Sequence, residues 1–193
     1  FSINNVDINI IAQKPHQSDY AFMDAGIPVL APAGMQEFAA FGVLGWALSR
    51  FSGCWVGIKA LTSAIDSSAS IDAAAGHDLA IVTPEDVAMP ADGLNLRLND
   101  DWWEPEARLY NHKLPAAQAF ARANRIDRIV IDSGSDARLG IVTTGKSHLD
   151  VLEAFDRLGI DAARARRLGI RLYKVGLVWP LDRDGIRPFA QGL

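Results

Sequence analysis

The order of two apolar runs and the helical pattern between them constrains the fold of this chain most. Residues 27–32 and 54–62 each have the length and the boundaries of a buried strand. Between them, residues 35–51 carry apolar side chains at helical spacing. Val43, Trp46 and Ala47 widen the apolar stripe, so this helix is expected to be covered on much of its surface. Two strands joined by a helix form a βαβ unit, which predicts a parallel sheet.

A second βαβ pattern occupies the C-terminal part of the chain. Strands are predicted at residues 128–133, 138–145 and 171–180, and apolar residues at helical spacing predict a helix over 147–160. One more helix is predicted to start near residue 184. Both patterns together place the chain in the α/β class.

The segments that surround these two units are less regular. Residues 5–12 and 77–84 are predicted to form strands, and residues 84–99, rich in Pro, Gly, Asp and Asn, a long surface connection. Residues 107–126 are predicted to be mostly helical. Pro115 interrupts this pattern and fits the first turn of a new helix, where its missing N–H does no harm.

The composition excludes several classes of protein. The chain has 193 residues, of which 49% are hydrophobic and 22% charged, with a net charge of −4, so it is typical of a soluble globular protein without affinity for nucleic acid. No apolar run reaches the length of a membrane span. The single cysteine, Cys54, forms no disulfide within the chain and holds no zinc or iron–sulfur site alone, which predicts a reducing, cytoplasmic location.

The stretch GIVTTGKS at residues 140–147 matches the phosphate-binding loop of nucleoside triphosphatases. Its four middle residues are all β-branched and favour a strand rather than a loop that curls around phosphate. The remaining alternative is an anion contact at the carboxyl end of a strand, made by Thr144, Lys146 and Ser147. The competing interpretation is that Ser147 caps the following helix and Lys146 is solvated.

Several longer segments together resemble one family. GIVTTGKSHLDVLEAFDRLGI and GIRLYKVGLVWPLD resemble the large bacterial indolepyruvate ferredoxin oxidoreductases, as do PHQSDYAFMDAGIPVLAPAGMQEF, GWALSRFSGCWVGIKALT and LNLR…EARLYNHKLPAAQAFARANRIDR. The resemblance covers residues 15–193. It implies a thiamine-diphosphate-dependent enzyme that decarboxylates a 2-oxoacid to an acyl-CoA and passes electrons through 4Fe-4S clusters to ferredoxin.

The resemblance also implies a domain organisation. Residues 1–76 would be the later half of a pyrimidine-binding domain, 77–127 a connecting segment, and 128–193 the start of a transketolase C-terminal-like domain. The partners implied are other domains of the same polypeptide, ferredoxin, coenzyme A and a small 2-oxoacid, in a homodimeric parent enzyme. The chain is therefore expected to be a fragment of that parent.

Parts that such an enzyme needs are not found in the sequence. It contains no GDG motif, which in this family holds the diphosphate and Mg²⁺, and one cysteine cannot hold the clusters. The chain alone is therefore expected to be inactive and to bind none of these cofactors. An alternative function is a non-catalytic α/β module that binds an anion such as coenzyme A, and a weaker alternative is a nucleoside triphosphatase.

The resemblance singles out one loop as a candidate part of the active site. His16, Gln17, Ser18 and Asp19 correspond to a loop that in related enzymes lies near the substrate side of the cofactor. His16 is suited to proton transfer near neutral pH. The alternative is an ordinary turn in which Asp19 caps the next helix. Lys59, in a predicted strand, could bind an anion, but a surface or interface charge is the simpler interpretation.

Overall fold

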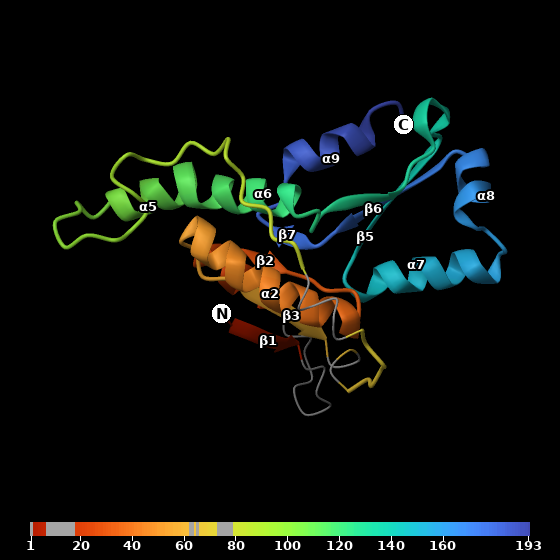
Figure 1. The fold of residues 1–193 in the computed structure, drawn as a ribbon, viewed down its shortest axis with the longest axis horizontal. Coiled ribbons are helices and arrows are strands. Elements are labelled where there is room, and N and C mark those ends of the chain that lie inside the picture. Colours follow the sequence, from red (N-terminus) through yellow and green to blue (C-terminus); the bar gives the residue numbers. More distant parts are fainter. Residues whose placement is uncertain (1, 7–17, 62–63, 65, 73–78) are drawn as a thin grey trace.

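The computed structural model describes residues 2–6, 18–61, 64, 66–72 and 79–193. Two small sheets are surrounded by helices, which confirms the α/β prediction (Figure 1). One sheet has the strand order β1-β3-β2-β7 and the other the order β4-β6-β5. No helix in these ranges is long and apolar enough to cross a membrane.

The first sheet is built on the predicted βαβ unit. Strands β2 (Val29–Leu30) and β3 (Gly57–Leu61) are parallel, and β1 (Ser2–Val6) pairs with the other edge of β3. The strand predicted at residues 5–12 thus begins earlier, and its part beyond residue 6 lies outside the described residues. Strand β7 (Leu177–Trp179) pairs antiparallel with β2 and forms the other edge of the sheet.

Helix α2 (Met35–Ser52) joins the two central strands as predicted, and Gly53 ends it in the left-handed conformation that glycine adopts most easily. The prediction that Val43 and Trp46 extend the covered surface of the helix is wrong. Trp46 is 62% exposed and Val43 is also exposed, so only one face of α2 is buried. A wide apolar stripe predicts burial only if a neighbour lies on each side of it.

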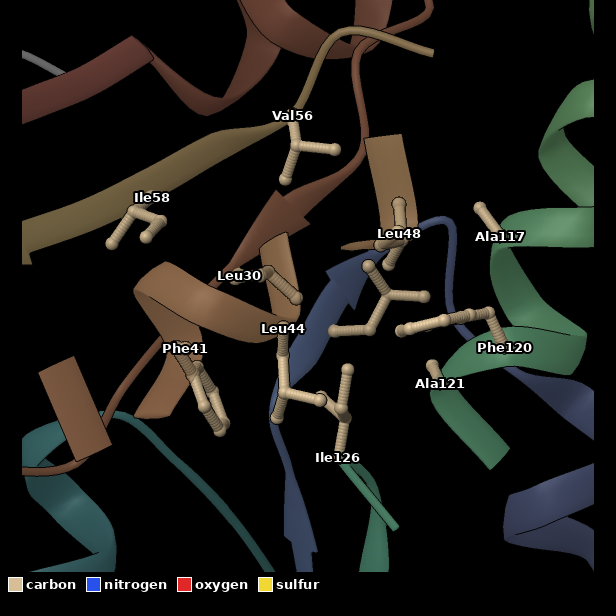
Figure 2. Close-up of a cluster of buried hydrophobic side chains, with 11 residues drawn as sticks. Leu30, Phe41, Leu44, Leu48, Val56, Ile58, Ala117, Phe120, Ala121 and Ile126 are labelled. Atoms are coloured by element: carbon tan, nitrogen blue, oxygen red, sulfur yellow. The ribbon is translucent and has the colours of Figure 1, made fainter. Parts of the chain in front are cut away.

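The main core lies where α2 packs between the first sheet and α6. Eleven buried side chains form it, and Figure 2 shows Leu44, Leu48 and Phe120 near its centre. Leu177 of β7 belongs to the same cluster, so the C-terminal part of the chain contributes to the first core.

The long helical segment in the middle of the chain consists of α5 (Glu104–Arg108), a π-helical stretch (Leu109–Lys113) and α6 (Leu114–Ala123). Pro115 lies in the first turn of α6, as predicted. Helix α6 buries Ala117, Phe120 and Ala121 against α2.

The strand predicted at residues 77–84 is wrong over its described part, because residues 79–84 form no strand. The side-chain amide of Asn124 forms hydrogen bonds with the backbone of Val82 instead. Val82 N donates to Asn124 Oδ1 at 2.8 Å, and Asn124 Nδ2 donates to Val82 O at 2.8 Å. An apolar run can pack on a core without joining a ladder, and Leu79 does so.

The second sheet contains β4 (Arg128–Ile131), β5 (Leu139–Thr144) and β6 (Ile170–Val175). Strand β5 is parallel to β6, and α7 (Lys146–Arg157) and α8 (Ala162–Arg167) lie between them in sequence. This is the second predicted βαβ unit, with β4 added antiparallel to β6. Side chains alternate between the two faces of the sheet. Leu172 packs with residues of α7 and α8, and Tyr173 with residues of α9 (Arg183–Ala190).

The single strand predicted over residues 171–180 is wrong, because two strands form there in two different sheets. Gly176 separates β6 from β7. A Cβ at this position would lie 2.5 Å from Ile126 O, so glycine permits the close approach of the two chain segments. Asp127 Oδ1 accepts hydrogen bonds from Gly176 N at 2.7 Å and Leu177 N at 2.8 Å, which holds the chain at the crossing.

Candidate functional site

A cavity of about 400 Å³ lies where the carboxyl ends of β2, β3 and β5 meet, and we call it the first cavity. Ala31 and Pro32 follow β2, Lys59 lies in the middle of β3 and Leu61 at its end, and Thr144 ends β5. Open α/β sheets bind ligands at this edge because helix N-termini and loops converge there. Its volume is within the range of small-molecule sites.

Lys59 and Asp19 form an ion pair on the wall of the first cavity. Lys59 Nζ lies 2.7 Å from Asp19 Oδ2, and the two side chains are 30% and 26% exposed. Asp19 is the first residue of α1 (Asp19–Asp24), and Ser18 rather than Asp19 occupies the N-cap position. A partly exposed pair of this kind adds only about 0–1 kcal/mol to stability, so both groups can exchange partners for a ligand at little cost.

The loop between β5 and α7 supplies the other charged group. Gly145 has φ +50°, which favours glycine, and the helix begins directly at Lys146. Lys146 forms an exposed ion pair with Asp150 one turn further along. Lys146 lines the cavity, and the ion-pair partner of its ammonium group, Asp150, is exposed to solvent.

The alternative that Ser147 caps α7 is wrong, because Gly145 occupies the N-cap position and Ser147 lies inside the first turn. Ser147 Oγ donates to Thr144 O at 2.6 Å. This bond ties the first turn of the helix to the end of β5. The hydroxyl oxygen can still accept a hydrogen bond from a ligand.

The two groups of residues singled out in the sequence come together at this cavity. Asp19 comes from the predicted active-site loop, and Thr144, Lys146 and Ser147 from the predicted anion contact; all four line the cavity. Ser18 precedes α1, and its buried Oγ has no hydrogen-bond partner in the described part of the chain. His16 and Gln17 lie outside the described residues.

The backbone of residues 140–147 does not form a phosphate-binding loop. Residues 141–144 are part of strand β5 and pair with β6 in continuous parallel register, as their β-branched side chains predict. Their N–H groups are thus not arranged as a cradle around an anion. What remains is the short turn at Gly145 and the start of α7.

A buried polar cluster lies beside the first cavity, and no local sequence pattern indicates it. The Glu37 carboxylate accepts hydrogen bonds from Lys174 Nζ, from Arg128 Nη2 at 3.1 Å and from Ala33 N at 2.8 Å. Lys174 is fully buried and its Nζ lies 5.0 Å from the centre of the Phe41 ring.

Burial and hydrogen bonding act in opposite directions on the acid–base behaviour of this cluster. Burial by itself would raise the pKa of Glu37, but the hydrogen bonds from Lys174, Ala33 N and Arg128 outweigh it and lower the pKa. Burial lowers the pKa of Lys174, and its contact with Glu37 opposes this shift. Each member of the pair thus favours the charged form of the other.

His148 of α7 is part of the same region and is held by Thr143. Thr143 Oγ1 donates to Tyr173 O at 3.0 Å and lies 2.9 Å from His148 Nδ1. Because Thr143 has one hydroxyl proton, Nδ1 must carry the proton of the second bond, which leaves Nε2 of the neutral ring as an acceptor. Burial lowers the pKa of His148, and the charge of Lys174 lowers it further.

The sequence pattern contained little signal for Lys59, Glu37, Lys174 and His148. A single lysine in a strand has the same local pattern whether it faces solvent or a cavity. The pairing of Glu37 with Lys174 spans 137 positions in sequence. Such contacts follow from the packing of the two sheets, which local periodicity does not describe.

Comparison with known protein families identifies the C-terminal part of the chain. The family model described as the indolepyruvate oxidoreductase domain matches residues 129–193. This part of the chain is similar to the indolepyruvate oxidoreductase domain. The family resemblance seen in the sequence is thereby confirmed over this range. A search of curated proteins found no match to the chain.

The matched part of the chain, residues 129–193, contributes one side of the first cavity. Thr144, Lys146, Ser147 and Val178 lie within the matched range, whereas Asp19 and Lys59 lie before it. The domain also supplies β7 to the first sheet. The cavity is therefore formed jointly by the matched domain and by the segment that precedes it.

Proposed function

We propose that this chain is part of a thiamine-diphosphate-dependent 2-oxoacid:ferredoxin oxidoreductase of the indolepyruvate type. The parent enzyme would decarboxylate a 2-oxoacid oxidatively, form an acyl-CoA and pass the electrons to ferredoxin. The observation that carries the proposal is the match of residues 129–193 to the indolepyruvate oxidoreductase domain. A cytoplasmic, homodimeric parent is part of the same proposal.

The proposed domain limits remain those expected from the sequence: a pyrimidine-binding-like part over residues 1–76, a connection over 77–127 and a transketolase C-terminal-like part from 128. Support comes from the two parallel βαβ units, one in each terminal part. Strand β7 of the C-terminal part pairs with β2 of the N-terminal part. The two parts therefore share one sheet and are not structurally independent.

The first cavity is proposed to contact the 2-oxoacid or coenzyme A. Its wall is largely apolar, with Phe38 and Val178, and two lysines, Lys59 and Lys146, also line it. This combination suits an anion with an apolar body. Lys59 would orient the anion by exchanging Asp19 for it, and His16, which precedes α1 in the sequence, would transfer a proton.

The metal centres of such an enzyme are proposed to be held outside this chain. The described residues hold no group of three or more His, Cys, Asp or Glu side chains that could bind a metal ion, and the sequence has one cysteine, which is buried. Mg²⁺, the diphosphate and the 4Fe-4S clusters would therefore be held by other domains. When bound, thiamine diphosphate would supply the carbanion chemistry of the decarboxylation.

The test uses the natural protein in which this chain occurs. Reduction of a viologen dye is measured with indolepyruvate, coenzyme A and thiamine diphosphate, and then with ferredoxin in place of the dye. Lys59→Gln is expected to lower kcat/KM about tenfold or more, since it removes a charged contact. Lys113→Gln is the matched control, because Lys113 donates to Gly53 O away from the cavity. Absence of turnover with every 2-oxoacid tried would refute the proposal.

A non-catalytic anion-binding module is the second candidate, and the position of Lys146 beside the first turn of α7 favours it. It predicts that the 193-residue chain binds coenzyme A with micromolar affinity in calorimetry, and that Lys146→Gln abolishes the binding. It also predicts no 2-oxoacid oxidation by the natural protein. Mg-ATP is expected to leave the melting temperature unchanged, because β5 does not form a phosphate-binding loop.

A further inference from the structure

A second cavity, of about 370 Å³, lies on the other side of the contact between the starts of α2 and α7. Glu37, Arg128 and His148 form its polar wall, and Met35, Leu149 and Leu152 its apolar wall. Only the first turns of α7 separate it from the first cavity, which Lys146 and Ser147 line. The second cavity shares no lining residue with the first.

The polar wall of the second cavity carries an excess positive charge. Arg128 and Lys174 are both paired with Glu37, so two cations share one carboxylate. His148 adds no charge, because burial and Lys174 favour its neutral form. Asp127, the other acidic group near Lys174, is not on the cavity wall and is bonded to the amides of Gly176 and Leu177.

Arg128 is the cation that a ligand can reach. Its side chain is 33% exposed, and it makes a single hydrogen bond to Glu37, at 3.1 Å. Within the described residues its remaining N–H groups have no partner. A guanidinium group can bind a carboxylate through two N–H donors, so Arg128 has the capacity for a second anion.

The opposite wall exposes apolar surface. Leu149 is 44% exposed and Leu152 is 36% exposed, although both lie on the side of α7 that faces this cavity. Aliphatic side chains at a cavity lined on one side by a cation suit a ligand with one charged end and one apolar end.

From this arrangement we propose that the second cavity is a binding site for a small monocarboxylate with an apolar body. The carboxylate binds the free N–H groups of Arg128, and the apolar body packs on Met35, Leu149 and Leu152. His148 forms a neutral wall that is fixed by Thr143. The proposal is independent of the function proposed above, because no residue of the first cavity takes part.

The experiment measures the thermal stability of the 193-residue chain with hexanoate, 1-hexanol, hexylammonium or acetate. Hexanoate is expected to raise the melting temperature in a concentration-dependent manner, because it binds only the folded state. 1-Hexanol lacks the charge, hexylammonium reverses it and acetate lacks the apolar body, so each should have a much smaller effect. Equal protection by hexanoate and 1-hexanol would overturn the carboxylate assignment.

Variants then test whether hexanoate binds in the second cavity. Arg128→Gln is expected to weaken hexanoate binding about tenfold, whereas Arg157→Gln removes the same charge from an exposed position of α7 and should leave it unchanged. Leu152→Glu introduces a repelling carboxylate at a position that tolerates polar groups, and it keeps the test valid if Arg128→Gln unfolds the chain. If Lys146→Gln abolishes the protection while Leu152→Glu does not, hexanoate binds the first cavity and the proposal is wrong.

Discussion

The fully buried ammonium of Lys174 on β6 pairs with the carboxylate of Glu37 on α2, and the pair links α2 to the second sheet. The partners are unequal, since the Lys174 side chain has no exposed surface and that of Glu37 is 21% exposed. Glu37 also binds Arg128 and Ala33 N, whereas Lys174 has no second hydrogen-bond partner in the described part of the chain.

This inequality predicts different costs for the two single substitutions. Glu37→Gln leaves the buried ammonium without an anion and is expected to lower the free energy of unfolding by about 3 kcal/mol. Lys174→Met removes the buried charge and leaves Glu37 with two partners, so about 1–2 kcal/mol is expected. Urea unfolding of both variants measures the difference. Equal costs would mean that the pair is accessible to water in solution.

His148 predicts a stability that depends on pH. Burial lowers its pKa in the folded state, so the unfolded chain binds the proton more tightly. The stability that neutral His148 contributes is present above the unfolded pKa of about 6.5 and is lost as the pH falls through and below that value. His148→Gln should therefore flatten the fall in stability between about pH 7 and pH 5.

Urea unfolding of the wild type and of His148→Gln at several pH values measures how the stability of each depends on pH. His112→Gln is the control, because His112 is a partly exposed residue of the π-helical stretch that contacts Ala88 O. An identical pH profile for the wild type and His148→Gln would contradict the prediction.

Local patterns predicted the elements whose partners are close in sequence. Helix α2 and its flanking strands follow from periodicity, because β2, α2 and β3 form one compact unit. The switch from β6 to β7 could not be predicted in this way. It depends on Asp127, which binds the amides on both sides of the crossing, and on the close approach of Ile126.

The candidate site was predictable in its parts and not as a whole. Thr144 and Lys146 follow a recognisable strand, and the carboxyl ends of parallel strands are where ligands bind. That Asp19 and Lys59 lie at the same cavity depends on how the two sheets are joined through β7. Helical periodicity also could not show that Trp46 lacks a covering neighbour.

Two glycines provide a test of the packing at the crossing. Gly176→Ala is expected to lower stability by about 3 kcal/mol or more, because the new Cβ would meet Ile126 O at 2.5 Å and backbone atoms cannot easily move aside. Gly42→Ala introduces the same methyl group inside α2, where no atom lies within 4 Å. It should raise stability by about 0.5–1 kcal/mol through helix propensity. Thermal and urea unfolding of both variants shows whether each substitution lowers or raises stability. An unchanged stability of Gly176→Ala would contradict the close approach.

The carboxyl group of Asp127 is expected to be the most important single polar group at the crossing. Asp127→Ala leaves the amides of Gly176 and Leu177 without an acceptor in a buried place, at an expected cost of about 2–4 kcal/mol. Asp127→Asn keeps an acceptor oxygen and places its amide where Oδ2 has no partner, so a smaller loss of about 1–2 kcal/mol is expected.

The cost of Asp127→Asn should also change with pH in a defined direction. Burial raises the pKa of Asp127 in the folded state, so its stabilising effect is complete below the unfolded pKa of about 3.9 and is lost as the pH rises through the folded value. The difference in stability between the wild type and Asp127→Asn should therefore shrink as the pH rises above about 4. Asp156→Asn, at an exposed position of α7, is the control and should show no such change. A difference that grows with pH would mean that the folded protein favours the charged carboxylate, and that the two amide hydrogen bonds outweigh its burial.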